Sequence, residues 1–182
     1  MAITNLRVCA PLVAALLLSA CQNSTKSGAA GAKTAAERAV KTLREEATQF
    51  DPERLKELTD VLSQSDKDFK AARYADVMVE LKDFPSKLKE LGDSVSANKK
   101  KAEESWKQQK EDMPGLLETV ETAMIDQDLL TKRVNSKLAK VKLLWAEAEG
   151  LKAADKLGEA VAKAKQAREA QRALADIVMP EK

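Results

Sequence analysis

The sequence predicts an all-α protein, built as an irregular antiparallel helical bundle or as a short array of helical hairpins. Three observations lead there. Ala, Leu, Lys and Glu dominate the 182 residues, and all four are strong helix formers. Aromatic residues make up only 3% of the chain and β-branched residues are sparse, so a sheet would be hard to build. From Ala35 onward, apolar residues recur at the helical spacings of three and four.

The first 20 residues are typical of a secretory signal peptide. Arg7 lies in a short cationic start, and an apolar run from Val8 to Ala20 follows it. This run is too short to cross a membrane, which takes about 20 apolar residues. It ends in Leu18-Ser19-Ala20-Cys21, which resembles the lipobox of bacterial lipoproteins at all four positions. An ordinary signal peptide with a chance cysteine is the alternative.

The lipobox resemblance implies a defined maturation. The Cys21 thiol would receive a diacylglyceryl group, the chain would be cut between Ala20 and Cys21, and the new amine would be acylated, typically with palmitate. Two or more acyl chains anchor a protein stably to a membrane. Gln22 stands where an Asp, in enterobacterial lipoproteins, directs retention in the inner membrane. We therefore expect a lipid anchor in the bacterial cell envelope, on the periplasmic face of the outer membrane rather than in the inner membrane.

A tether and one domain are expected after the cleavage site. Residues 21–34 are expected to form the lipidated cysteine and a flexible linker. The linker is predicted because this segment contains Ser, Thr, Gly and Ala and no large apolar residue. Fully extended, the linker from Gln22 to Thr34 would reach about 45 Å. Residues 35–182 are then expected to form a single helical periplasmic domain, because a chain of that length fits one domain.

The helices of the first half have recognisable boundaries. One is expected from about Thr34 to Gln49. Asp51 should cap the next, because Pro52 follows at the first helical position. The expected buried face of that helix comprises Leu55, Leu58, Leu62 and Phe69.

A further helix should begin near Tyr74. Pro85 predicts a kink or break near Phe84, and Gly92 predicts a stop.

The second half begins with a polar run. The segment 94–112 is expected to be a solvated helix with Trp106 as its apolar anchor, and residues 112–115 (Asp-Met-Pro-Gly) to be a turn or a helix restart. The longest periodic stretch, Leu116 to Leu151, changes register at Gln127 and Thr131. Either the helix is interrupted at residues 126–128 or its buried face rotates there. A last helix should run from about Asp155 to Val178, before Pro180.

Two segments echo each other. Phe69 to Met78 resembles Leu151 to Val161, with one residue inserted. In both, an Ala-rich turn separates two amphipathic segments, which is similar to the helical hairpins of tetratricopeptide units. The full 34-residue pattern of those units is absent, so an irregular bundle with two similar hairpins is the alternative.

The residue inventory excludes several kinds of chemistry. The chain has no His, hence no Ser-His-Asp triad and no imidazole metal ligand. Once the leader is removed, Cys21 is the one cysteine left, so neither an internal disulfide nor a cysteine metal site can form. Carboxylates alternate with Lys, as on solvated helix faces. We expect no enzyme, no cofactor and no metal. A formal net charge of +2 gives no argument for nucleic-acid binding.

The function expected from these features is a membrane-anchored, non-enzymatic interaction or scaffold module that binds a periplasmic or envelope protein. One alternative is a structural tether to peptidoglycan through Lys182. The chain resembles the small murein lipoprotein of enteric bacteria in its lipobox, its helices and its final Lys, although the Tyr-Arg that precedes the Lys there is missing. A small-ligand carrier or an enzyme is the weaker alternative, and it would need a pocket with convergent polar groups.

Overall fold

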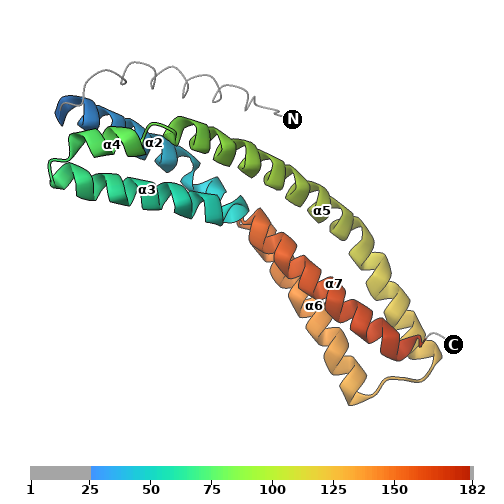
Figure 1. Ribbon diagram of the computed structural model, residues 1–182. Coiled ribbons are helices and arrows are strands. Elements are labelled where there is room, and N and C mark those ends of the chain that lie inside the picture. Colours follow the sequence, from blue (N-terminus) through green and yellow to red (C-terminus); the bar gives the residue numbers. More distant parts are fainter. Residues whose placement is uncertain (1–25, 181–182) are drawn as a thin grey trace. The chain divides into compact units, whose positions relative to one another are not determined.

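The structure is a computed structural model that describes residues 26–180, and that part is all-α (Figure 1). Its helices are α2 (Lys26–Phe50), α3 (Pro52–Lys70), α4 (Tyr74–Glu80), α5 (Phe84–Asp126), α6 (Lys132–Ala153) and α7 (Leu157–Val178). The chain divides into two compact units, with the boundary between Ser96 and Ala97. The sequence predicted one domain over residues 35–182, and parts of both units fall within that range. Each unit has buried residues of its own, so each is described by itself.

Unit 1 contains α2, α3, α4 and the first part of α5. The helices α2, α3 and α4 lie against one another, and α5 joins them through its large apolar side chains (Figure 1). The largest fully enclosed side chains of this core are Phe84, Leu58, Leu91, Val40 and Val77. Three helices and the start of a fourth thus share one apolar interior.

The helix α2 begins earlier than predicted. Residues 26–34 were expected to be part of a flexible linker, but they form the first turns of α2. The reason is packing, because Ala29, Ala32 and Ala36 are buried against unit 1. Lys33 adds a polar contact, since its Nζ lies 2.7 Å from Asp66 Oδ1 on α3. Small side chains that look featureless in sequence let two helices approach closely.

The corner between α2 and α3 forms as the sequence predicts. Asp51 caps α3, and its Oδ1 accepts a hydrogen bond from the backbone N–H of Arg54 at 3.2 Å. Ser94 Oγ donates to Asp51 Oδ2 at 2.6 Å, which joins α5 to the same corner. Burial raises the pKa of Asp51, but the hydrogen bonds from Ser94 and Arg54 outweigh it and the pKa is lowered overall.

The helix α5 crosses two predicted boundaries. It was expected to stop at Gly92 and to turn or restart at residues 112–115, and both expectations are wrong, because α5 is continuous with Pro114 inside it. Buried anchors on both sides of each breaker explain this. Leu91 and Val95 flank Gly92, and Met113 precedes Pro114. Their burial outweighs the helix penalty, which is about 1 kcal/mol for Gly and about 3 kcal/mol for Pro.

Unit 2 contains the rest of α5 together with α6 and α7. The helices α6 and α7 form a hairpin, and they approach closely because buried alanines lie along them (Figure 1). Those alanines are Ala148, Ala160, Ala164 and Ala167. Toward the other end of the hairpin, Val120 and Met124 of α5 pack with Leu174 of α7.

Three of the helices end in the same type of backbone turn. A residue with positive φ follows the helix in each case: Ala72 (59°), Asp128 (53°) and Asp155 (61°). The next N–H then bonds a carbonyl five residues back, from Arg73 to Asp68, from Leu129 to Met124 and from Lys156 to Leu151, at 2.9, 2.9 and 3.0 Å. This is the Schellman motif, which satisfies carbonyls at a helix C-terminus. Where the sequence left a choice near residues 126–128, the helix is interrupted, and Thr131 caps α6.

The internal echo is visible in these turns. The α3–α4 and α6–α7 turns have matching hydrogen bonds and matching positive-φ positions. Each following helix then begins with an ion pair across three residues, Arg73 with Asp76 at 3.5 Å and Lys156 with Glu159 at 3.3 Å. The same turn also ends α5, so it is not specific to the two hairpins, and the resemblance to tetratricopeptide units stays a prediction.

Candidate functional site

The residues that the sequence singles out for attachment lie outside the described part of the chain. Ala20 and Cys21 precede it, and Lys182 follows it. Lipidation, cleavage and wall attachment therefore remain predictions from the sequence. The described residues offer four other places to look for function: a buried carboxyl cluster, a shallow pocket, an aromatic pair and a cationic helix face.

The buried carboxyl cluster lies where α3 turns into α4. Asp68 is almost fully buried, and it accepts hydrogen bonds from Arg73 Nε at 2.9 Å, from a second nitrogen of the same guanidinium and from Gln64 Nε2 at 3.0 Å. Ser65 is fully buried, and its Oγ donates to Glu80 Oε2 at 2.8 Å. The cluster connects the end of α3 with both ends of α4.

The two carboxyl groups of this cluster differ in their acidity. Burial raises the pKa of Glu80, and the neighbouring Asp68 raises it further, against a lowering by the Ser65 hydroxyl. The Arg73 guanidinium and Gln64 lower the pKa of Asp68, against the effect of burial. Opposite shifts in two neighbouring carboxyls also occur in active sites. Here the polar groups form hydrogen bonds with one another, so the cluster stabilises the α3–α4 turn.

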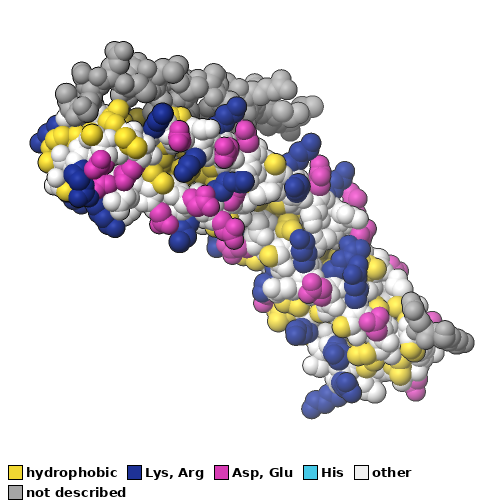
Figure 2. Space-filling view, viewed as in Figure 1, with side chains coloured by type: hydrophobic (Ala, Val, Ile, Leu, Met, Phe, Trp, Pro, Cys, Tyr) yellow, Lys and Arg dark blue, Asp and Glu magenta, His cyan; other side chains and the backbone are white. Residues whose placement is uncertain are grey.

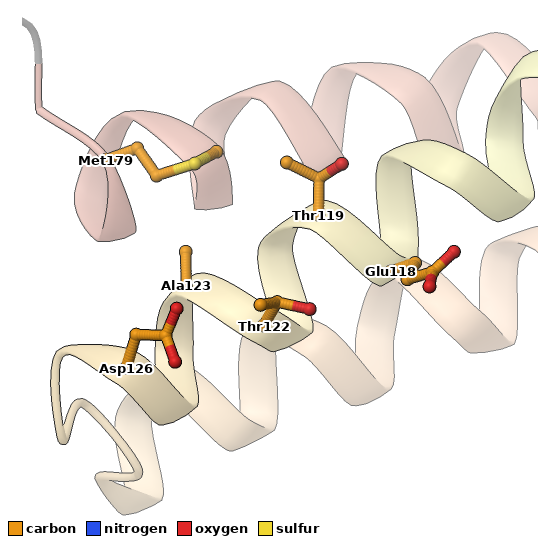
Figure 3. A pocket seen from close by; sticks show the side chains of 6 residues that line it. All are labelled: Glu118, Thr119, Thr122, Ala123, Asp126 and Met179. Carbon is orange, nitrogen blue, oxygen red and sulfur yellow. The ribbon is translucent and has the colours of Figure 1, made fainter.

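A pocket of about 420 Å³ lies near the end of α5 (Figure 3). Five of its lining residues come from α5: Glu118, Thr119, Thr122, Ala123 and Asp126. Met179 extends toward them from the end of α7. The Thr119 hydroxyl is occupied, because it donates to the Gly115 carbonyl at 2.8 Å. The pocket is wide open to solvent, so it encloses little of a small ligand.

The aromatic pair of unit 2 is part of the core. The Trp106 and Trp145 rings stack with centroids 5.6 Å apart and an interplanar angle of 10°. Trp145 is buried, and Trp106 packs on the cluster of Met113, Ala148 and neighbouring alanines. Trp106 was expected to be an apolar anchor, and its packing confirms this. Each ring therefore covers a face of the other, and the pair contributes to packing.

Cations gather on the first half of α6. Lys132, Arg133, Lys137, Lys140 and Lys142 lie on that stretch, and no acidic residue is present between Leu129 and Ala146. Figure 2 shows dark-blue side chains on the part of unit 2 where α6 begins. Leu130 and Leu143, 55% and 60% exposed, lie on the same segment. Sequence reasoning missed this surface, because charge was summed over the whole chain rather than over single helices.

Metal and membrane-spanning sites were sought in the same residues. Between residues 26 and 180, no three His, Cys, Asp or Glu side chains are grouped in a way that could hold a metal ion. In the same residue range, none of the helices is both long enough and apolar enough to cross a bilayer.

The chain was also compared with known proteins. No family model, no curated protein and no solved structure matches it.

Proposed function

We propose that this chain is a lipoprotein of the bacterial cell envelope, anchored through Cys21, whose helical body is a non-enzymatic interaction or scaffold module. The observation that carries the proposal is the run Leu18-Ser19-Ala20-Cys21 at the end of an apolar leader. Lipid on Cys21 holds the body at the bilayer, which raises its local concentration there and lets weak contacts suffice.

Two features of the body support a binding role over a catalytic one. Asp68 and Glu80 are the clearest pair of titratable groups with shifted pKa values. Both carboxyl groups already accept hydrogen bonds from neighbouring side chains. The pocket near Thr122 is shallow and open. Helical faces, in contrast, are typical docking surfaces for partner helices and peptides. The expected partner is a periplasmic or envelope protein.

The anchor is tested by the variant Cys21→Ser. We expect wild-type protein, expressed with its own leader in a bacterium, to end at an acylated Cys21 by intact-mass spectrometry and to fractionate with membranes. The variant should keep its leader and carry no acyl groups. An unmodified wild-type chain, or one cleaved elsewhere, would contradict the proposal.

The side of the envelope is tested by Gln22→Asp. Because Gln22 stands at the position where Asp favours inner-membrane retention, the wild type should band with the outer membrane on a density gradient. The variant should shift to the inner membrane. A wild type already in the inner membrane would contradict the outer-membrane placement.

The binding role is tested by crosslinking the lipidated full chain in intact envelopes, alongside a variant lacking Lys182. A stoichiometric protein partner that persists without Lys182 is the expected result. Muropeptides recovered only when Lys182 is present would overturn it and make the chain a wall tether.

A further inference from the structure

The first half of α6 has a charge pattern unlike the rest of the chain. The full sequence is nearly balanced, with 31 Lys and Arg against 29 Asp and Glu. Five of those cations fall between Lys132 and Lys142, without one anion. The next acidic residue along the helix is Glu147, which pairs with Lys163 of α7 at 3.0 Å. The cationic charge of this segment is therefore concentrated rather than compensated within the helix.

Helical spacing places most of these cations on one face. Lys132, Lys140 and Leu143 stand at positions i, i+8 and i+11, which share a side of an α-helix. Arg133 lies beside them, and all four side chains are exposed. On the opposite side of α6, Val134 and Val141 pack into the core. We call the surface formed by Lys132, Arg133, Lys140 and Leu143, with Leu130 just before the helix, the α6 cationic face.

Within residues 26–180, the cations of this face have no acidic partner. Lys142 lies to one side and pairs with Glu121 of α5 at 2.7 Å. Lys132, Arg133 and Lys140 make no ion pair with any residue of the described part. Asp126 at the end of α5 and Asp128 in the following loop precede the helix, yet neither pairs with these three side chains. Their charge is available to a partner.

Two of these cations also oppose the stability of their own helix. Lys132 and Arg133 occupy the first turn of α6, which contains no acidic residue. The N-terminal end of a helix carries a partial positive charge, so cations there are unfavourable. Residues that cost helix stability and form no ion pair within the described part point to a role outside the fold.

We propose that the α6 cationic face docks onto a bilayer surface that contains anionic phospholipids. Charge complementarity argues for an anionic surface, because Lys and Arg near such a bilayer each contribute about fivefold in affinity. Leu130 and Leu143 argue for lipid in particular, since exposed leucines among cations can enter the headgroup region. The face has no aromatic side chain on which a nucleobase could stack. The contact does not depend on the modification of Cys21, so it extends the proposed function and can fail separately.

The test uses the full chain, reconstituted in nanodiscs made of phosphatidylcholine with or without phosphatidylglycerol. A photoreactive benzophenone amino acid replaces the residue at position 143, and lipid adducts are measured by mass spectrometry. We expect at least about tenfold more adduct with phosphatidylglycerol present, and loss of that gain in high salt. Intact mass of the same sample reports the state of Cys21, so failure of the anchor is distinguished from failure of the docking.

Charge reversal supplies the matched comparison. The triple variant Lys132→Glu, Arg133→Glu and Lys140→Glu should reduce the adduct to the phosphatidylcholine level. Its melting temperature should not fall, because two of the changes place acid at a helix N-terminus. The control Lys82→Glu, Lys87→Glu and Lys89→Glu alters the net charge equally on exposed residues of unit 1, and it should retain the adduct.

Three results would overturn the proposal. The first is an adduct yield that does not depend on phosphatidylglycerol or on salt. The second is equal loss in the two triple variants, which would mean that only net charge matters. The third is an adduct to a protein rather than to lipid when the labelled chain is irradiated in intact envelopes, which would assign the face to an acidic protein partner.

Discussion

At the scale of single residues, strain and charge pairing are concentrated where helices end or meet. Ala72 adopts a φ of 59°, a left-handed conformation that suits Gly and costs other residues free energy. Asp68, Glu80 and Ser65 surround the same turn with charge and hydrogen bonds. The α3–α4 turn thus combines an unfavourable backbone with favourable side-chain contacts, and the two can be separated by mutation.

Ala72→Gly should stabilise the protein by about 1 kcal/mol, because Gly adopts positive φ without the steric cost of a Cβ. The measurement is urea denaturation. Ala71, one residue earlier, has a φ of −81°. The control Ala71→Gly should therefore give no gain or a small loss. An equal gain from both variants would show that the left-handed backbone at Ala72 carries no strain.

Glu80→Gln should make the protein more stable at neutral pH. The folded-state pKa of Glu80 is raised above its ordinary value of 4.5, chiefly by burial. Its contribution to stability is therefore fully present below about pH 4.5 and is lost as pH rises through the folded pKa. The gain from Gln should appear in denaturation curves at pH 7 and shrink in acid. A gain that does not change with pH would contradict the raised pKa.

Lys33→Met should raise the pKa of Asp66. The hydrogen bond from Lys33, together with the one from Lys70, lowers the pKa of Asp66 to about 2. Without Lys33 the pKa should move toward 3.8, as followed by NMR titration of the carboxyl carbon. The control Lys56→Met removes a separate ion pair, with Asp60, and should leave the pKa of Asp66 unchanged. Because the pKa of Asp66 is depressed, its stabilisation should be lost as pH falls from about 4 to 2.

At the scale of helices, local signals predicted some boundaries correctly and others wrongly. The Asp51 cap, the start near Tyr74 and the break before Phe84 follow from local chemistry, and they form as expected. Gly92 and Pro114 failed as stop signals because buried residues on either side hold α5 together. The early start of α2 was hidden for a related reason. Alanines give a weak apolar pattern in sequence, although Ala29 and Ala36 are almost fully buried.

Gly92→Ala should stabilise α5 by about 0.5–1 kcal/mol, the helix-propensity difference between the two residues. The new Cβ would lie 4.0 Å from Leu43 Cδ1, which is ordinary van der Waals contact. Thermal unfolding measures the gain. Gly31→Ala in α2, whose Cβ would meet nothing within 4 Å, tests propensity without that contact. A loss of stability in Gly92→Ala alone would show that the space beside Leu43 is tighter than the structure has it.

At the scale of the whole molecule, the predicted all-α fold class is correct, and the described helices divide between two compact units. Composition and periodicity fix the helical class, because they act through local propensity and amphipathic faces. They do not reveal how many cores the helices share. The α6 cationic face could have been found from sequence by counting charge helix by helix. The Asp68–Glu80 cluster could not, because it depends on how α3 and α4 fold back on each other.

Separate cores predict separate stabilities. Leu174→Ala removes a fully buried side chain from unit 2 and should cost that unit about 2–5 kcal/mol. Hydrogen exchange should then show faster exchange in α6 and α7, with α2 and α3 still protected. Leu91→Ala in unit 1 should produce the reverse pattern. Equal loss of protection throughout the chain in either variant would contradict two separately stabilised units.

The early start of α2 has a consequence for the reach of an anchored protein. Only four residues separate Cys21 from Lys26, so they span at most about 18 Å, against the 45 Å of the longer linker expected from sequence. If Cys21 carries the lipid, the first turn of α2 lies within about 18 Å of the lipidated residue. The linker then adds little reach, and the helical body, with α5 alone 43 residues long, sets how far from the bilayer a partner can be met.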